Sequence, residues 1–319
     1  VYNNRYAEAD GWIRTSVGIS VGDAGKRQVI QKSLAQSLNL VDDDAVFYLF
    51  RDERAGNEYL RKGASLCRDG IHIHLGAFKV NVFCDFREMK DYDGQLRRLH
   101  DILDGRGIPD VLGALGELYL EKVLNPFKEL LSADSLVHTL TQGYSGKAVP
   151  QEYAQRLKHF LWHAKEFSQA PGDVESVTEN ICSIADALMS IGELKEYRIL
   201  KNEPCVAYLF SRIPQEFSKD LSWWRVALVW AAICRIGMLF SEKEVAARSR
   251  SLMNEWMLGR HTLRLFRALG LDEHSARYET LLVEISSGTR TGNIRSSKEI
   301  PLCLCSPCFP IPMSGHISV

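Results

Sequence analysis

The chain has 319 residues, of which 45% are hydrophobic and 25% are charged, and its formal net charge is −1. This length is sufficient for two domains with a core each. The near-neutral charge excludes the basic excess that is typical of a nucleic-acid-binding protein. We therefore expect a globular protein without a nucleic-acid partner.

Neither a signal peptide nor a membrane span is predicted. The amino terminus lacks a basic segment followed by an apolar one. The most apolar stretch, residues 223–240, is interrupted by Arg225 and Arg235, and the nine residues between these arginines are too few to cross a bilayer. This stretch is predicted to be a buried helix. The eight cysteines show no disulfide framework, which favours a reducing cytoplasm.

Residues 1–90 are predicted to form strands, because apolar and polar residues alternate and turn residues punctuate them. In chain order, the expected elements are a strand run over 12–21, a helix over 28–38, strands over 45–51 and 58–61, and a hairpin that joins 71–75 to 80–85. The first region is therefore predicted to be an antiparallel β-sandwich or sheet.

Residues 91–108 are charged and contain the breaker Gly105-Arg106-Gly107, so a linker is predicted there. From 109 to 285 the apolar residues follow a helical period, with helices expected over 153–167, 174–191, 215–240, 242–269 and 273–285. The predicted fold class is α+β, in which the β module precedes a bundle-like helical region.

Residues 286–319 are rich in glycine, serine, proline and cysteine, and they are predicted to be a disordered tail. Cys303, Cys305 and Cys308 form a local group of metal-type ligands, with His316 as a fourth. A structural zinc site usually needs two paired clusters, so an incidental tail is the favoured interpretation.

No complete catalytic site is evident, since the serine-hydrolase elbow, the zinc-protease motif and the dinucleotide fingerprint are all missing. No cofactor is expected. His72 and His74 would project from the same face of one strand and, with Asp85 on the neighbouring strand, could hold a metal ion or exchange protons. The polar face of an amphipathic strand explains them equally well.

Two aromatic residues near the predicted sheet, Trp12 and Tyr2, are candidates for stacking on a sugar. Trp223, Trp224 and Trp230 stand at helical spacing and are expected to belong to a core instead.

Three segments together suggest a family. They are residues 1–17, 50–59 with the hairpin that follows, and 247–259, which read VYNNRYAEADGWIRTSV, FRDERAGNEY and ARSRSLMNEWMLG. They resemble the region that follows the catalytic barrel in a group of bacterial α-amylase-like proteins of glycoside hydrolase family 13. The resemblance covers most of residues 1–285.

The resemblance implies a β-sandwich domain that caps the barrel and a helical extension behind it. In that family the catalytic carboxylates lie on the barrel, so no catalytic residue can be assigned here. The implied function is a non-catalytic accessory region of an enzyme acting on α-glucans, with the barrel of the parent chain and α-glucan as partners. The opening at Val1, within a strand-like pattern, is what a piece of a longer chain would show.

This hypothesis predicts an exposed apolar face on the β module, where the barrel would pack. The alternative is a stand-alone helical protein that binds other proteins and uses the β module as a platform.

Overall fold

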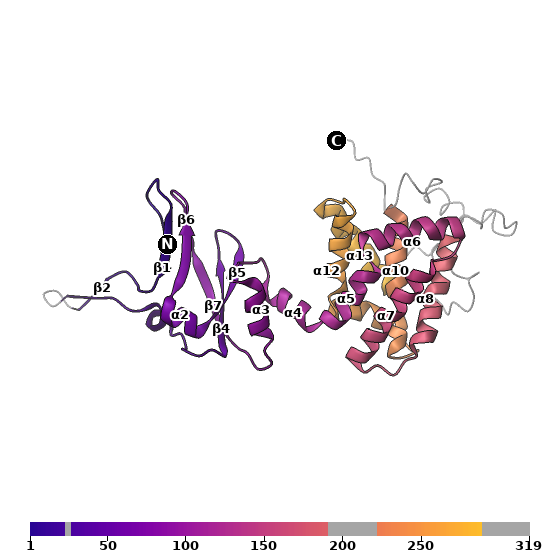
Figure 1. Ribbon diagram of the computed structural model, residues 1–319, viewed down its shortest axis with the longest axis horizontal. Coiled ribbons are helices and arrows are strands. Elements are labelled where there is room, and N and C mark those ends of the chain that lie inside the picture. The colour runs from indigo at the N-terminus through magenta and orange to yellow at the C-terminus, as the bar shows by residue number, and fades with distance from the viewer. Residues whose placement is uncertain (23–26, 191–221, 289–319) are drawn as a thin grey trace. The chain divides into compact units, whose positions relative to one another are not determined.

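The computed structural model describes residues 1–22, 27–190 and 222–288, and the chain divides into two compact units, Val1–Tyr119 and Leu120–Val319 (Figure 1). All the described strands lie in the first unit, and the described part of the second unit is helical. The predicted α+β class, a β module before a helical region, is confirmed.

A three-stranded antiparallel sheet organises the first unit. Its central strand β4 (Val46–Asp52) pairs with β5 (Asn57–Lys62) on one side and with β7 (Phe83–Lys90) on the other. The apolar run of β4 is explained by burial on both faces. Phe47 and Leu49 pack against α3 (Gln95–Leu103) and α4 (Val111–Tyr119). The alternate residues Val46, Tyr48 and Phe50 face α2 (Gly63–Asp69) and β6 (Ile71–Leu75).

Two further pairs of strands lie outside this sheet. Strand β1 (Ala9–Ile13) pairs with β6, and β2 (Ile19–Val21) pairs with β3 (Gln28–Ile30), both antiparallel. The predicted hairpin of 71–75 with 80–85 is therefore wrong. Alternation specifies which face of a strand is buried, but it does not specify the partner strand.

The helix predicted over 28–38 is shorter than expected. Residues Gln28–Ile30 are strand β3, and only Leu34–Leu38 form helix α1. The start of α1 is set by a capping box, in which the side chains of Ser33 and Gln36 each bind the other residue's backbone N–H.

The segment predicted as a linker, 91–108, contains helix α3 and belongs to the first unit. Leu96, Leu99 and Leu103 fall on one face of α3 and pack against the sheet. Gly105 follows the left-handed residue Asp104 that ends the helix. The breaker thus marks the end of α3, and the chain divides into its two units between Tyr119 and Leu120.

The second unit is built around a buried helix. Its described helices are α5 (Glu121–Leu130), α6 (Ala133–Gly146), α7 (Gln151–Ser168), α8 (Val174–Met189), α10 (Ser222–Ile233), the 3-10 helix η2 (Ile236–Leu239), α11 (Val245–Glu255), α12 (Leu258–Ala268) and α13 (Glu273–Ser287). Helix α10 contacts α6, α8, α11 and α13. Trp224 and Trp230 are buried, as predicted for core residues.

The helices at the end of this unit differ in part from expectation. The helix predicted over 242–269 is two helices, α11 and α12, separated by Met257 in the left-handed conformation. The predicted helix over 273–285 is present as α13. The early part of the helix predicted over 215–240 and nearly all of the tail lie outside the described residues. No helix within the described ranges is long and apolar enough to cross a membrane.

Candidate functional site

The outer face of the β1–β6 pair carries the polar candidates. Trp12 lies directly opposite His72, and Asp10 lies opposite His74. The rings of Trp12 and His72 meet edge to face with centroids 4.9 Å apart. His72 Nε2 lies 2.8 Å from Asp10 Oδ1, and His74 Nε2 lies 3.7 Å from Glu8 Oε2. Each histidine is therefore paired with a carboxylate of the neighbouring segment.

The structure does not bring together the three residues proposed as a metal site. His72 and His74 share one face of β6, as predicted, but Asp85 belongs to β7, in a different sheet. The reason is the pairing described above, since β6 lies beside β1 and not beside β7. Asp85 is instead near Glu53 and Cys84.

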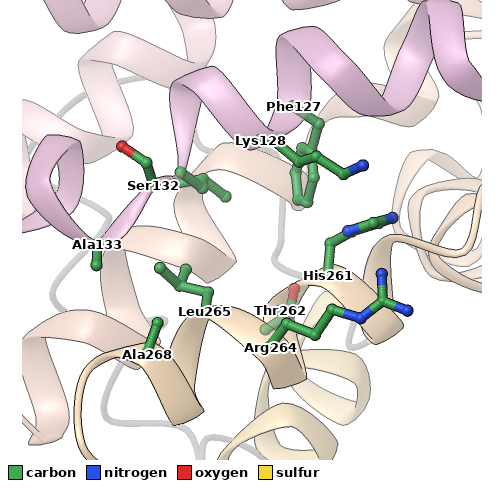
Figure 2. Close-up of a pocket in the computed structure, with 10 residues that line it drawn as sticks. Phe127, Lys128, Ser132, Ala133, His261, Thr262, Arg264, Leu265 and Ala268 are labelled. Carbon is green, nitrogen blue, oxygen red and sulfur yellow. The ribbon is translucent and has the colours of Figure 1, made fainter.

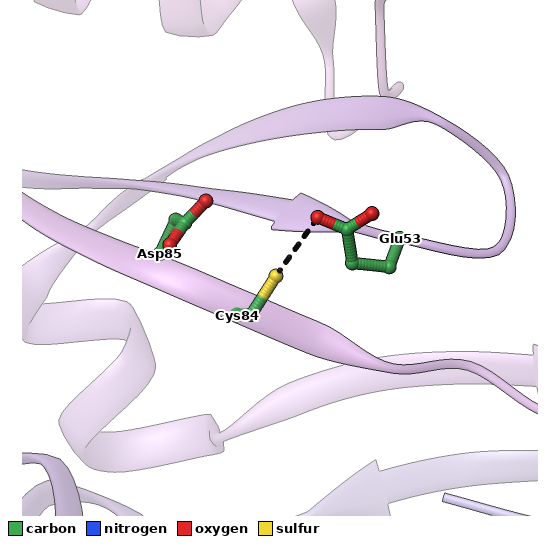
Figure 3. A group of neighbouring side chains, drawn as sticks. All are labelled: Glu53, Cys84 and Asp85. Atoms are coloured by element: carbon green, nitrogen blue, oxygen red, sulfur yellow. Dashed lines mark hydrogen bonds between the residues drawn. The ribbon is translucent and has the colours of Figure 1, made fainter.

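Glu53, Cys84 and Asp85 form a small exposed cluster at a β-bulge (Figure 3). The bulge falls where the β4–β7 register shifts, and Asp85 there adopts a positive φ of 54°. Cys84 Sγ lies 3.6 Å from Glu53 Oε1. Partial burial, this hydrogen bond and the charge of Asp85 raise the pKa of the Cys84 thiol. A thiol that stays protonated is a poor metal ligand and a poor nucleophile.

Exposed aromatic residues gather beside the β1–β6 pair. Tyr2 bridges to Val80 in an antiparallel fashion, and Tyr6 meets Phe78 edge to face at 4.8 Å. Tyr2 is 62% exposed and Trp12 is 52% exposed, so both predicted sugar-stacking residues are accessible. Tyr6 and Phe78 were not among the residues predicted from the sequence.

The side chain of Asn3 helps to hold the segment that carries Tyr2 and Tyr6. The amide nitrogen of Asn3 donates to the carbonyl oxygens of Ala7, Leu75 and Gly76, and its oxygen accepts from the backbone of Arg5. Asn3 is itself buried. These bonds tie the start of the chain to the end of β6, so the backbone around Tyr2 and Tyr6 is held in place.

The β2–β3 ribbon projects from the body of the first unit (Figure 1) and all its described strand residues are exposed. Ile19 lies directly opposite Ile30, and Val21 follows on the same face, while Val29 lies on the other face. An isolated two-stranded ribbon is at best marginally stable in water. The ribbon therefore presents apolar surface that its own unit does not cover.

The second unit has a pocket of about 290 Å³ between α5, the start of α6 and α12. Phe127, Leu131 and Leu265 supply apolar walls, and Figure 2 shows the side chains of Lys128 and Arg264 on the opposite side of the pocket from Ala133. None of the described residues that line this pocket is acidic. It consequently lacks the pair of carboxylates that glycoside cleavage needs.

No protein-family model, no curated protein and no solved structure matches this chain. A function must therefore be argued from the residues and their arrangement. They combine an exposed aromatic face and an exposed apolar ribbon in the first unit with a well-packed helical second unit.

Proposed function

We propose that this chain is a non-catalytic accessory region of an α-amylase-like glycoside hydrolase that acts on α-glucans, and that its first unit packs against the catalytic barrel of the parent protein. The observation that carries the proposal is the exposed apolar surface of the β2–β3 ribbon and of the β1–β6 margin. Single exposed apolar residues are ordinary, but a ribbon with several of them is typical of a surface that another domain covers.

The occupant is proposed to be a barrel because of the family resemblance in the same segments. The resemblance in residues 1–17 covers β1 and leads directly into β2, and its second segment includes the end of β4 and the start of β5. The surface that needs cover therefore adjoins the segments that suggest the family. A cytoplasmic location is part of this proposal.

Contact with α-glucan is proposed for Trp12 and Tyr2. Sugar rings bind to the faces of aromatic side chains, and both side chains are more than half exposed. Trp12 is also positioned by His72, whose ring lies against it and whose Nε2 is held by Asp10. A fixed ring loses little conformational entropy on binding.

Affinity electrophoresis through gels that contain soluble starch or glycogen tests this part. The chain is expected to be retarded by the polysaccharide, and Trp12→Ala is expected to remove most of the retardation. Trp162→Ala is the matched control, because Trp162 is equally exposed but lies on α7 of the second unit. Equal migration with and without polysaccharide would contradict the glucan contact.

The second candidate is a free-standing helical protein that binds other proteins, with the β module as its platform. The same exposed ribbon favours it, because a partner protein would cover the ribbon as well as a barrel would. The two proposals differ in whether the occupant is encoded in the same chain.

A further inference from the structure

Two histidines lie one turn apart on the exposed side of α7. His159 and His163 are four residues apart, which places both side chains on one face of the helix. Their Nε2 atoms are 3.0 Å apart, and their rings are nearly perpendicular with centroids separated by 4.6 Å. Neither residue belongs to the apolar core of the unit.

A carboxylate from the neighbouring helix faces the other nitrogen of the first histidine. Helix α5 packs along α7, and Glu129 of α5 places Oε2 3.9 Å from His159 Nδ1. Histidines that bind metal ions commonly direct their second ring N–H to a carboxylate, which fixes the ring and its tautomer. The distance to Glu129 is longer than a hydrogen bond, so the carboxylate acts on the His159 ring through its charge. With the proton on Nδ1, His159 Nε2 carries a lone pair and can accept the contact from His163 Nε2.

The separation of the two Nε2 atoms suits a shared ion. Zinc binds imidazole nitrogen at about 2.0–2.1 Å, so an ion equidistant from nitrogens 3.0 Å apart would meet them at an angle of roughly 94°. The tetrahedral angle would need a separation of about 3.3 Å, which a few tenths of an ångström of side-chain movement provides. The helix thus holds both ligands close to their bound positions.

We propose that His159 and His163 chelate a divalent transition-metal ion that prefers imidazole, with Zn²⁺ as the representative, and that Glu129 positions His159. Water would supply the remaining coordination positions, because His159 is half exposed and the ion can approach from solvent. Binding requires no change of backbone, since the two ligands share one helix. This site is independent of the proposed glucan function.

Isothermal titration of the chain with Zn²⁺ at neutral pH tests the proposal. The background carries Cys303→Ser, Cys305→Ser and Cys308→Ser, so that the tail thiols do not bind the ion. His159→Ala and His163→Ala are each expected to weaken Zn²⁺ binding at least tenfold, because either change leaves one ligand. His138→Ala is the matched control, since His138 is exposed on α6 and should leave the affinity unchanged.

Glu129→Gln examines the positioning role, because it keeps the side-chain size and removes the charge. Loss of such an outer partner weakens metal binding by roughly ten-fold or more. The melting temperature supplies a second readout, as a ligand that binds the folded state raises it. The proposal is overturned if the background does not bind Zn²⁺, or if His163→Ala binds it as tightly as the background does. An unchanged affinity in Glu129→Gln would overturn the role of Glu129.

Discussion

Arg225 of α10 and Glu279 of α13 form a two-pronged ion pair at the edge of the second unit's core. The guanidinium donates from Nε to Glu279 Oε2 at 2.5 Å and from a terminal nitrogen to Oε1. Only 15% of the Arg225 side chain and 7% of the Glu279 side chain are exposed. The pair joins the central helix α10 to the last described helix.

Glu279→Gln is expected to destabilise the protein, because it leaves the guanidinium of Arg225 nearly buried without its charged partner. Breaking a buried pair from one side costs about 3 kcal/mol of unfolding free energy. Urea denaturation measures this change in unfolding free energy. Glu175→Gln is the control, since Glu175 pairs with Lys158 in solvent, and exposed pairs contribute about 0–1 kcal/mol. Equal effects of the two substitutions would contradict the importance of burial.

Asp52 ties the β4–β5 turn to the segment before β7. Its carboxylate accepts from the backbone N–H of Arg54 at 3.0 Å, from that of Val82 at 3.4 Å and from the side chain of Asn81. Burial by itself would raise the pKa of Asp52, but these hydrogen bonds outweigh it and hold the pKa below its usual range.

The lowered pKa of Asp52 predicts a pH dependence of stability. The charged form is favoured in the folded state, so its contribution is present above the unfolded value of about 4 and is lost as pH falls through the folded pKa. Asp52→Asn should lower the free energy of unfolding by about 2 kcal/mol at neutral pH. It should also make the loss of stability at acidic pH less steep. Asp44→Asn, at an exposed turn, is the control. If the free energy of unfolding falls equally with decreasing pH in the wild type and in Asp52→Asn, Asp52 does not contribute to the pH dependence.

Gln169 ends α7 in the left-handed conformation, with φ of 52°, and its side chain is exposed. Glycine adopts this conformation without the steric cost that a Cβ atom imposes, so Gln169→Gly should stabilise the protein by about 0.5–1 kcal/mol. Gln155→Gly is the matched control within the same helix and should destabilise by about 1 kcal/mol. Thermal denaturation measures both changes, and a shift in the same direction would argue against the left-handed end of α7.

Whether the β2–β3 ribbon is uncovered can be tested on this chain alone, without the domain or protein proposed to cover it. Ile19→Thr and Val29→Thr keep β-branched residues in β2 and β3 while they remove apolar surface. Each should lower the binding of a fluorescent hydrophobic dye and change unfolding free energy by within about 0.5 kcal/mol. Leu60→Thr, at a buried position of β5, should cost several-fold more. A large loss of stability from Ile19→Thr would mean that the chain itself covers the ribbon.

Local pattern predicted the elements better than their partners. Alternation placed His72 and His74 on one face of β6, which is correct, because the face of a side chain depends only on its own strand. The association with Asp85 failed because pairing between strands is a long-range property. Arg225 illustrates the same limit. The sequence indicated only a charge that interrupts an apolar run, whereas its partner Glu279 lies 54 residues further along the chain.

The histidine pair was predictable in principle but was missed. His159 and His163 stand four apart within a helix predicted over 153–167, and that spacing alone places them on one face. The approach of Glu129 was not predictable, since it depends on how α5 packs against α7.

Reading the coding DNA on the 5′ side of the Val1 codon would show whether this chain is the accessory region of an α-amylase-like enzyme. We expect an uninterrupted frame that encodes a barrel of alternating strands and helices with three carboxylates at strand ends. A start codon close to Val1, with no barrel before it, would rule out the accessory role and favour a free-standing interaction protein.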